Sequence, residues 1–146
     1  MSIAIPIANA QELSCLYQLS CEKHKTTPIP VILEHLEALN LEKSSKGRTE
    51  VLSLKQQTLT HESCEALEEL FKRVKYRAID VTSCSLDDSS ASSLFDMIEY
   101  YEACNELNFS ENPNIKNRGW LACKSIAPLC VITRPIIFIY SDLFSF

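Results

Sequence analysis

The feature that most constrains this chain is a short pattern of alternating apolar residues that recurs three times. The copies begin at Leu52, Ile79 and Leu107, so they lie 27 and then 28 residues apart. Self-similarity at such a period is typical of proteins built from stacked supersecondary units. Because one unit cannot bury its apolar faces alone, neighbouring units have to pack against each other.

The residues within each copy match the leucine-rich repeat pattern. Two apolar residues separated by one position form a short strand with one face inward. Three residues before each strand pair lies a further inward position, held by Thr49, Tyr76 and Cys104. A small polar residue after the strand can bond backbone groups that the turn leaves unpaired. Cys84 and Asn112 hold this position in the second and third copies, and Gln57 is a poorer fit in the first.

Apolar residues at helical spacing follow each strand. After the first strand they are Cys64, Leu67, Leu70, Phe71 and Val74, and after the second Ala91, Leu94, Phe95, Ile98 and Tyr101. Thr60 or the residues just after it, and residues 87–89, offer capping oxygens where these helices start. A third helix is expected from about Asn117, with Trp120 and Cys123 inward. The pattern predicts an α/β leucine-rich repeat solenoid of the ribonuclease-inhibitor type, with about three repeats and an N-terminal helical cap.

Three segments are expected along the chain. Residues 1–48 form the N-terminal helical cap and a polar loop, with helices over residues 11–21 and 28–39. Residues 49–127 hold the repeats, and residues 128–146 form a divergent or truncated C-terminal tail. Residues 136–140 lie where a fourth strand is due, but neither a turn residue nor a polar cap follows. We therefore expect either a product cut short from a longer solenoid or a divergent fourth strand.

Composition argues against several classes of function. The net charge of −5 opposes nucleic-acid binding, and two glycines are too few for a phosphate-binding loop. The sequence has seven cysteines and does not open with the pattern of a secretory signal. We therefore expect free thiols in the cytoplasm or, alternatively, the nucleus. The apolar segment 129–146 is interrupted by Arg134, Pro135 and Asp142, so no membrane span is expected.

Candidate catalytic and metal sites have simpler structural explanations. Cys21 and His24 with His61 and Cys64 could supply four zinc ligands, but Cys64 lies on the apolar side of its helix. Residues 72–76 (Lys-Arg-Val-Lys-Tyr) resemble a short peptide of the type basic-Val-x-Phe that docks on a partner protein, with Tyr in place of Phe. Such a peptide must be free and extended, but Val74 and Tyr76 fall on inward positions. Cys84 and Cys104 have repeat roles, and no histidine is expected near the strands. We expect no enzyme activity, no metal and no cofactor.

The candidate binding residues are those whose side chains point away from the core on the concave face, between or just after the inward positions. They are Ser53, Lys55, Gln56, Asp80, Thr82, Ser83, Asn108, Ser110 and Glu111. They form a mixed polar strip suited to a protein partner. The alternative is that contacts are made only by repeats that follow these.

Several non-consensus runs resemble the start of the repeat domain of the protein phosphatase 1 regulatory subunit 37 family. They are residues 63–74, 91–102, 107–110 and 117–120, with the upstream stretches 17–21 and 28–39. The resemblance covers roughly residues 11–124. It implies a non-catalytic protein that binds and restrains protein phosphatase 1. The family's docking motif, a basic residue followed by Val-x-Phe, does not occur in residues 1–11.

Two classes of function stay open on these grounds. The resemblance favours an inhibitory regulatory subunit of the phosphatase catalytic subunit. A generic leucine-rich repeat adaptor for another protein is the alternative, and a truncated product without the docking peptide is a third possibility. The oligomeric state and the identity of the partner do not follow from the sequence.

Overall fold

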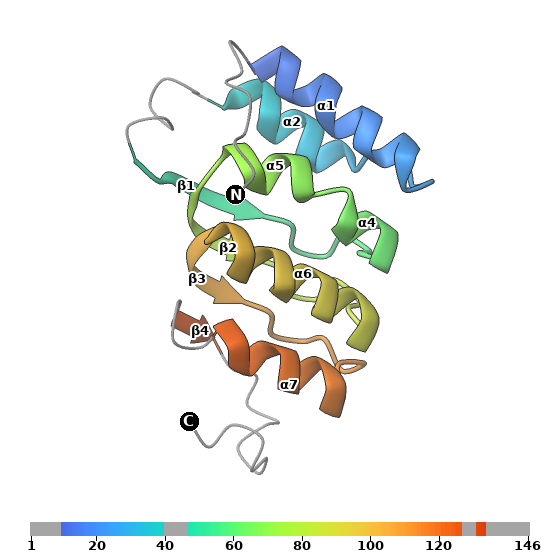
Figure 1. Ribbon diagram of the computed structural model, residues 1–146, viewed down its shortest axis with the longest axis vertical. Coiled ribbons are helices and arrows are strands. Elements are labelled where there is room, and N and C mark those ends of the chain that lie inside the picture. The colour runs from blue at the N-terminus through green and yellow to red at the C-terminus, as the bar shows by residue number, and fades with distance from the viewer. Residues whose placement is uncertain (1–9, 40–46, 127–130, 134–146) are drawn as a thin grey trace.

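The computed structural model describes residues 10–39, 47–126 and 131–133, and it shows an α/β arrangement of repeated strand–helix units (Figure 1). The helices are α1 (Ala10–Lys23), α2 (Pro30–Ala38), α4 (His61–Glu65), α5 (Glu68–Arg73), α6 (Asp88–Tyr101) and α7 (Asn117–Ile126). The strands are β1 (Thr49–Ser53), β2 (Tyr76–Asp80), β3 (Cys104–Asn108) and β4 (Val131–Thr133). They form one parallel sheet in the order β1-β2-β3-β4, with the helices stacked along one side. This architecture is consistent with a few leucine-rich-repeat-like units.

The strand register confirms the repeat spacing. Leu52 pairs with Ile79, which pairs with Leu107, and all three are buried. The additional inward position is aligned as expected, since Thr49 pairs with Tyr76 and Tyr76 with Cys104. The second inward residues, Leu54, Val81 and Phe109, lie one position beyond their strands and are fully buried. Backbone bonds from Leu54 N–H to Asp80 O and from Val81 N–H to Asn108 O, both 2.8 Å, continue the parallel pairing.

The fourth strand begins earlier than the repeat spacing favours. In β4, Ile132 pairs with Leu107, only 25 residues away. The preceding helix α7 has 10 residues where α6 has 14, so the chain returns to the sheet sooner. Residues 136–140, which the spacing favoured, lie outside the described residues.

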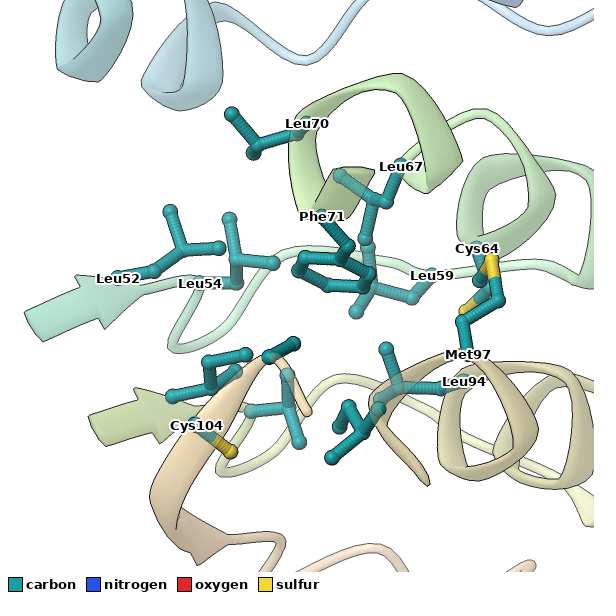
Figure 2. Packing of buried hydrophobic residues seen from close by; sticks show 14 of the residues in the cluster. Leu52, Leu54, Leu59, Cys64, Leu67, Leu70, Phe71, Leu94, Met97 and Cys104 are labelled. Atoms are coloured by element: carbon teal, nitrogen blue, oxygen red, sulfur yellow. The ribbon is translucent and has the colours of Figure 1, made fainter. Parts of the chain in front are cut away.

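The apolar helix positions form the predicted core. Every inward candidate of the first two helical segments is buried except Tyr101, which is partly buried against the cluster. Figure 2 shows Leu67 and Phe71 pointing toward Leu54 and Leu59, and Cys64 facing Met97 of α6. Trp120 and Cys123 of α7 are also buried. The first helical segment differs from expectation in being split into α4 and α5, where Leu67 N–H bonds the Cys64 carbonyl three residues back.

Two N-terminal helices precede the sheet, as the sequence predicts. Leu13 and Tyr17 of α1 are buried, and the Tyr17 hydroxyl accepts a 3.0 Å bond from Ile29 N–H just before α2. Pro30 occupies the first turn of α2, where its missing N–H has no helical partner to lose. Leu16, which precedes Tyr17 on α1, is only half-buried. The division of the chain at residues 48 and 127 stays a prediction.

Turns after the strands are held by the side chains at the predicted small polar position. The Asn112 Oδ1 accepts bonds from Cys84 N–H at 2.9 Å and Leu86 N–H at 3.1 Å. Its Nδ2 donates to the carbonyls of Val81, Phe109 and Ser110 at 2.9–3.0 Å. Cys84 lies in the same position one unit earlier, and its thiol donates to the Leu54 carbonyl at 2.8 Å. Each of these side chains therefore serves the turn of the unit before its own.

Candidate protein-binding face

The structure brings the predicted binding residues together at the ends of three adjacent strands. Ser53 pairs with Asp80, and Asp80 with Asn108, so these three side chains form one row across the sheet. The strand residues beside them, Leu52, Ile79 and Leu107, point into the core. Because neighbouring residues of a strand face opposite sides, the row lies on the side away from the helices. We call this side, with the nine predicted residues, the sheet face.

Two of the three units end their strands with the same side-chain turn. The Asp80 Oδ1 accepts bonds from the N–H and the hydroxyl of Thr82, at 3.0 and 2.6 Å. The Asn108 Oδ1 accepts the equivalent bonds from Ser110, at 3.0 and 2.7 Å. Short polar side chains that bond the backbone two residues ahead are a recognised way to turn a chain. The turn therefore occupies one oxygen of each side chain before any partner arrives.

In all three units, the third residue after the row adopts a left-handed backbone conformation. Gln56, Ser83 and Glu111 have φ angles of 63°, 54° and 57°. This region disfavours residues with a Cβ, but bonds from Gln56 N–H to Thr82 O and from Ser83 N–H to Ser110 O, both 3.0 Å, hold the chain there. The Ser83 hydroxyl also donates to Glu111 Oε2 at 2.7 Å. The backbone thus places these three side chains at one edge of the sheet face.

Charged side chains on the sheet face interact across neighbouring units. Lys55 Nζ lies 3.7 Å from Asp80 Oδ2, and the Lys55 side chain is 58% exposed. Arg77 Nη1 donates to Glu106 Oε2 at 2.8 Å, with both side chains about half exposed. Exposed pairs of this kind add little stability, because water and salt screen them. They leave the charges accessible to a partner.

Sequence reasoning missed a second row on the same face. Val51 pairs with Ala78, and Ala78 pairs with Glu106. Each lies two residues before the member of the predicted row on the same strand. Arg77, which contacts Glu106, belongs to the same part of the face. Strand alternation could have found this row, because its residues lie two positions before the predicted row and residues two apart on a strand share a side. It does not predict Arg77, which lies three residues before Asp80. Val51 is 38% exposed, and among the side chains that the structure describes it is the exposed large apolar one of this row.

The key residues of the docking-like segment 72–76 and the candidate zinc-binding or nucleophilic residues Cys64 and Cys84 lie in the core. Val74 and Tyr76 are fully buried, as the structural interpretation of the docking-like segment requires. Cys64 is fully buried, and burial raises the pKa of its thiol. Burial also raises the pKa of Cys84, to about 11, which disfavours a thiolate nucleophile at neutral pH. Among the described residues, no three His, Cys, Asp or Glu side chains gather as a metal site would require.

The fold and this face define an α/β protein of repeated strand–helix units with a polar surface on its parallel sheet. The described helices include none long and apolar enough to cross a bilayer. Comparison with curated proteins gives a more particular assignment: the chain belongs to the protein phosphatase 1 regulatory subunit 37 family, at about 43% identity over about three quarters of its length.

Three relatives illustrate the match. Protein phosphatase 1 regulatory subunit 37 of Danio rerio is 44% identical over 112 residues, which are 77% of this chain and 12% of the relative. The Homo sapiens protein of the same name is 43% identical over 106 residues, 73% of this chain and 15% of the relative. A homolog from Caenorhabditis elegans is 38% identical over 114 residues, 78% of this chain and 12% of the relative.

The matched region is a small part of those proteins. The chain spans about 12–16% of the length of the curated relatives it matches. No protein-family model matches the chain. No solved structure matches it either. The relatives therefore establish the family, while the activity of the whole relatives is carried to this chain only as a proposal.

Proposed function

We propose that this chain is a non-catalytic regulatory subunit that binds and inhibits protein phosphatase 1. The observation that carries the proposal is its identity of 38–44% to relatives named as regulatory subunits of that phosphatase. We propose a binding role rather than a catalytic one, because the described side chains of the sheet face are paired charges and turn-forming polar groups rather than an activated nucleophile. Free buried thiols at Cys21, Cys64 and Cys84 support a reducing compartment, the cytoplasm or the nucleus.

We further infer that the units are leucine-rich repeats of the ribonuclease-inhibitor type and form part of a solenoid. Parallel pairing at offsets of 27 and 28 residues supports this, as does a helix after each of the first three strands. In such a solenoid the sheet face is the concave surface. The packing of α1 against α2 and α5 fits a cap over the first unit.

The phosphatase is proposed to contact the sheet face. Support comes from the alignment of Ser53, Asp80 and Asn108 in one row and from the exposed charges of Lys55 and Glu111 beside it. The buried state of Val74 and Tyr76 argues against docking through residues 72–76, since a docking peptide must add to a partner as an extended strand.

A binding assay with the purified phosphatase catalytic subunit tests the proposal. We expect the full chain to retain the catalytic subunit and to lower its activity toward a phosphoprotein substrate. Simultaneous charge reversal of Lys55, Asp80 and Glu111 should weaken retention, because it removes the bonds from Thr82 to Asp80 and from Ser83 to Glu111 that shape the sheet face. The matched control reverses three charges on the helix side, at Glu62, Asp96 and Lys116, and should leave retention unchanged. Failure of the parent chain to retain the catalytic subunit would contradict the proposal.

A generic adaptor for another protein is the second candidate. It is favoured by the mixed polar composition of the sheet face, which is suited to protein partners in general. This candidate makes a distinct prediction for the same assay. The chain would fold and keep its sheet face accessible, yet the phosphatase catalytic subunit would not be retained.

A further inference from the structure

The sheet face has two parts that differ in how far their polar groups are already bonded. In the second and third units, Asp80 and Asn108 each accept two bonds from the turn that follows. Ser83 donates to Glu111. A partner that uses these groups has to share or displace an existing bond, which reduces the net gain from each new one.

The first unit leaves its polar side chains open. Ser53 occupies the same register position as Asp80, and Gln56 lies at the left-handed position equivalent to Ser83. Both are exposed, and neither side chain hydrogen-bonds another side chain or backbone group within the described part of the chain. Next to them lies the exposed apolar surface of Val51, whose register neighbour Ala78 has only a methyl group. We call Val51, Ser53 and Gln56 the β1 patch.

The described charges around the β1 patch compensate each other. Arg77 faces Glu106, and Lys55 faces Asp80. A charged group of a partner would meet one like and one opposite charge on each side, and would lose hydration without a net attraction. An uncharged segment with an apolar side chain is electrostatically matched to such a surface, since it loses little on desolvation.

We infer that the β1 patch is where the sheet face takes its partner, and that the partner presents an uncharged segment there. Its apolar side chain would lie on Val51, and its main-chain amide groups would bond the Ser53 hydroxyl and the Gln56 amide. This rests on the proposed function for the identity of the partner. Beyond that function, the inference names the residues of the sheet face that provide the affinity, and it states that they select an uncharged segment of the partner.

The test compares two exposed apolar residues that receive the same substitution. Val51→Glu puts a carboxylate in the β1 patch, and Leu121→Glu does so on α7, where Leu121 is 52% exposed. Calorimetric titration with the phosphatase catalytic subunit should show at least about tenfold weaker binding for Val51→Glu, as expected for an interface anchor. Leu121→Glu should bind as the parent does, and both variants should melt as the parent does by circular dichroism.

A second variant keeps the test decisive if Val51→Glu does not fold. Val51→Thr preserves the β-branched shape and adds only a hydroxyl, and it should weaken binding about threefold or more through lost apolar contact. Parent-like affinity in a folded Val51→Glu or Val51→Thr variant overturns the inference while the proposed function stands. A parent chain that does not bind the phosphatase overturns both.

Discussion

The junction between the first and second units and the junction between the second and third use the same apolar register but different polar chemistry. At the first junction, Cys84 reaches back to the first turn with one thiol, which donates to Leu54 O. At the second, the Asn112 amide bonds three backbone groups of the preceding unit, Cys84 N–H, Leu86 N–H and Val81 O, and also the carbonyls of Phe109 and Ser110 in its own unit. The comparison shows that stacking of apolar residues sets the architecture, while side-chain polarity determines how firmly each turn is held.

The hydrogen bonds at the helix starts also differ between the two junctions. Across the second junction, the Asp88 carboxylate accepts bonds from Lys116 N–H at 2.5 Å and Gly119 N–H at 3.0 Å, at the start of α7. Across the first, His61 contacts the Ser89 hydroxyl at 3.1 Å, and both side chains are exposed. The helix start at the second junction is therefore held by two backbone N–H bonds, and that at the first junction by a contact between side chains.

The largest expected effect is at Asn112. Asn112→Ala should destabilise the fold by about 3 kcal/mol, because it leaves several buried N–H and C=O groups without partners. Cys84→Ala should have a smaller effect, about 1 kcal/mol, since one weak donor and a small volume are lost. Urea unfolding of both variants measures the difference. Equal destabilisation would show that the amide adds nothing over the thiol.

A second contrast concerns the close approach of Asp88 to α7. A Cβ at Gly119 would lie 2.6 Å from Ile115 Cγ2 and 2.8 Å from Asp88 Oδ1. Gly119→Ala should therefore destabilise the fold by about 1–3 kcal/mol through overpacking, despite the better helix propensity of alanine. Gly47→Ala is the matched control, because nothing lies within 4 Å of its added Cβ. Thermal melting of the two variants should separate them clearly, and coincident melting curves would refute the packing argument.

Helix capping provides a third, smaller contrast. Asp87 and Ser90 form a capping box on α6, whereas Thr60 accepts a bond from Ser63 N–H on α4. Asp87→Ala should destabilise by about 1 kcal/mol, with Thr60→Ala at or below that value. The bond from Ser90 N–H lowers the pKa of the Asp87 carboxyl.

This lowered pKa makes the contribution of Asp87 depend on pH. Its stabilisation is complete above the unfolded pKa near 4 and is lost as the pH falls through the lower folded value. Urea midpoints of the parent and Asp87→Asn between pH 6 and pH 3 measure this. The two should converge at the acid end, and a constant difference across that range would contradict the assignment.

The smallest expected effect is at the contact between the N-terminal helices and the sheet. His35 Nε2 lies 2.9 Å from the hydroxyl of buried Tyr76 in β2, so the expectation that no histidine lies near the strands was wrong. Burial lowers the pKa of His35. Below the unfolded pKa near 6.5 the unfolded chain takes up a proton that the folded chain resists, so stability should fall between pH 7 and pH 5. Melting temperatures across this range should decline less in His35→Gln. An identical decline would place the sensitive group elsewhere.

Much of the fold could be predicted because inward positions repeat at a constant offset. The strand register, the buried helix positions and the turn role of Asn112 all follow from that offset and from residue type. The candidate row of Ser53, Asp80 and Asn108 follows from alternation, and so does Val51, two residues before Ser53. Arg77 does not, because it lies three residues before Asp80 and its place beside the sheet face depends on its bond to Glu106. The early start of β4 could not be predicted, since the length of α7 decides where the chain returns.

The amino-acid sequence by itself determined which side chains are inward, because a period near 28 can bury apolar residues continuously only if units stack in parallel. Which polar groups remain open to a partner was decided only by tertiary structure. Asp80 and Asn108 are occupied by turns, and Lys55 and Arg77 face carboxylates from the next unit. The Ser53 and Gln56 side chains make no hydrogen bond with the residues that the structure describes. These pairings depend on distances of a few ångströms between units, and residue spacing along a single strand carries no information about them.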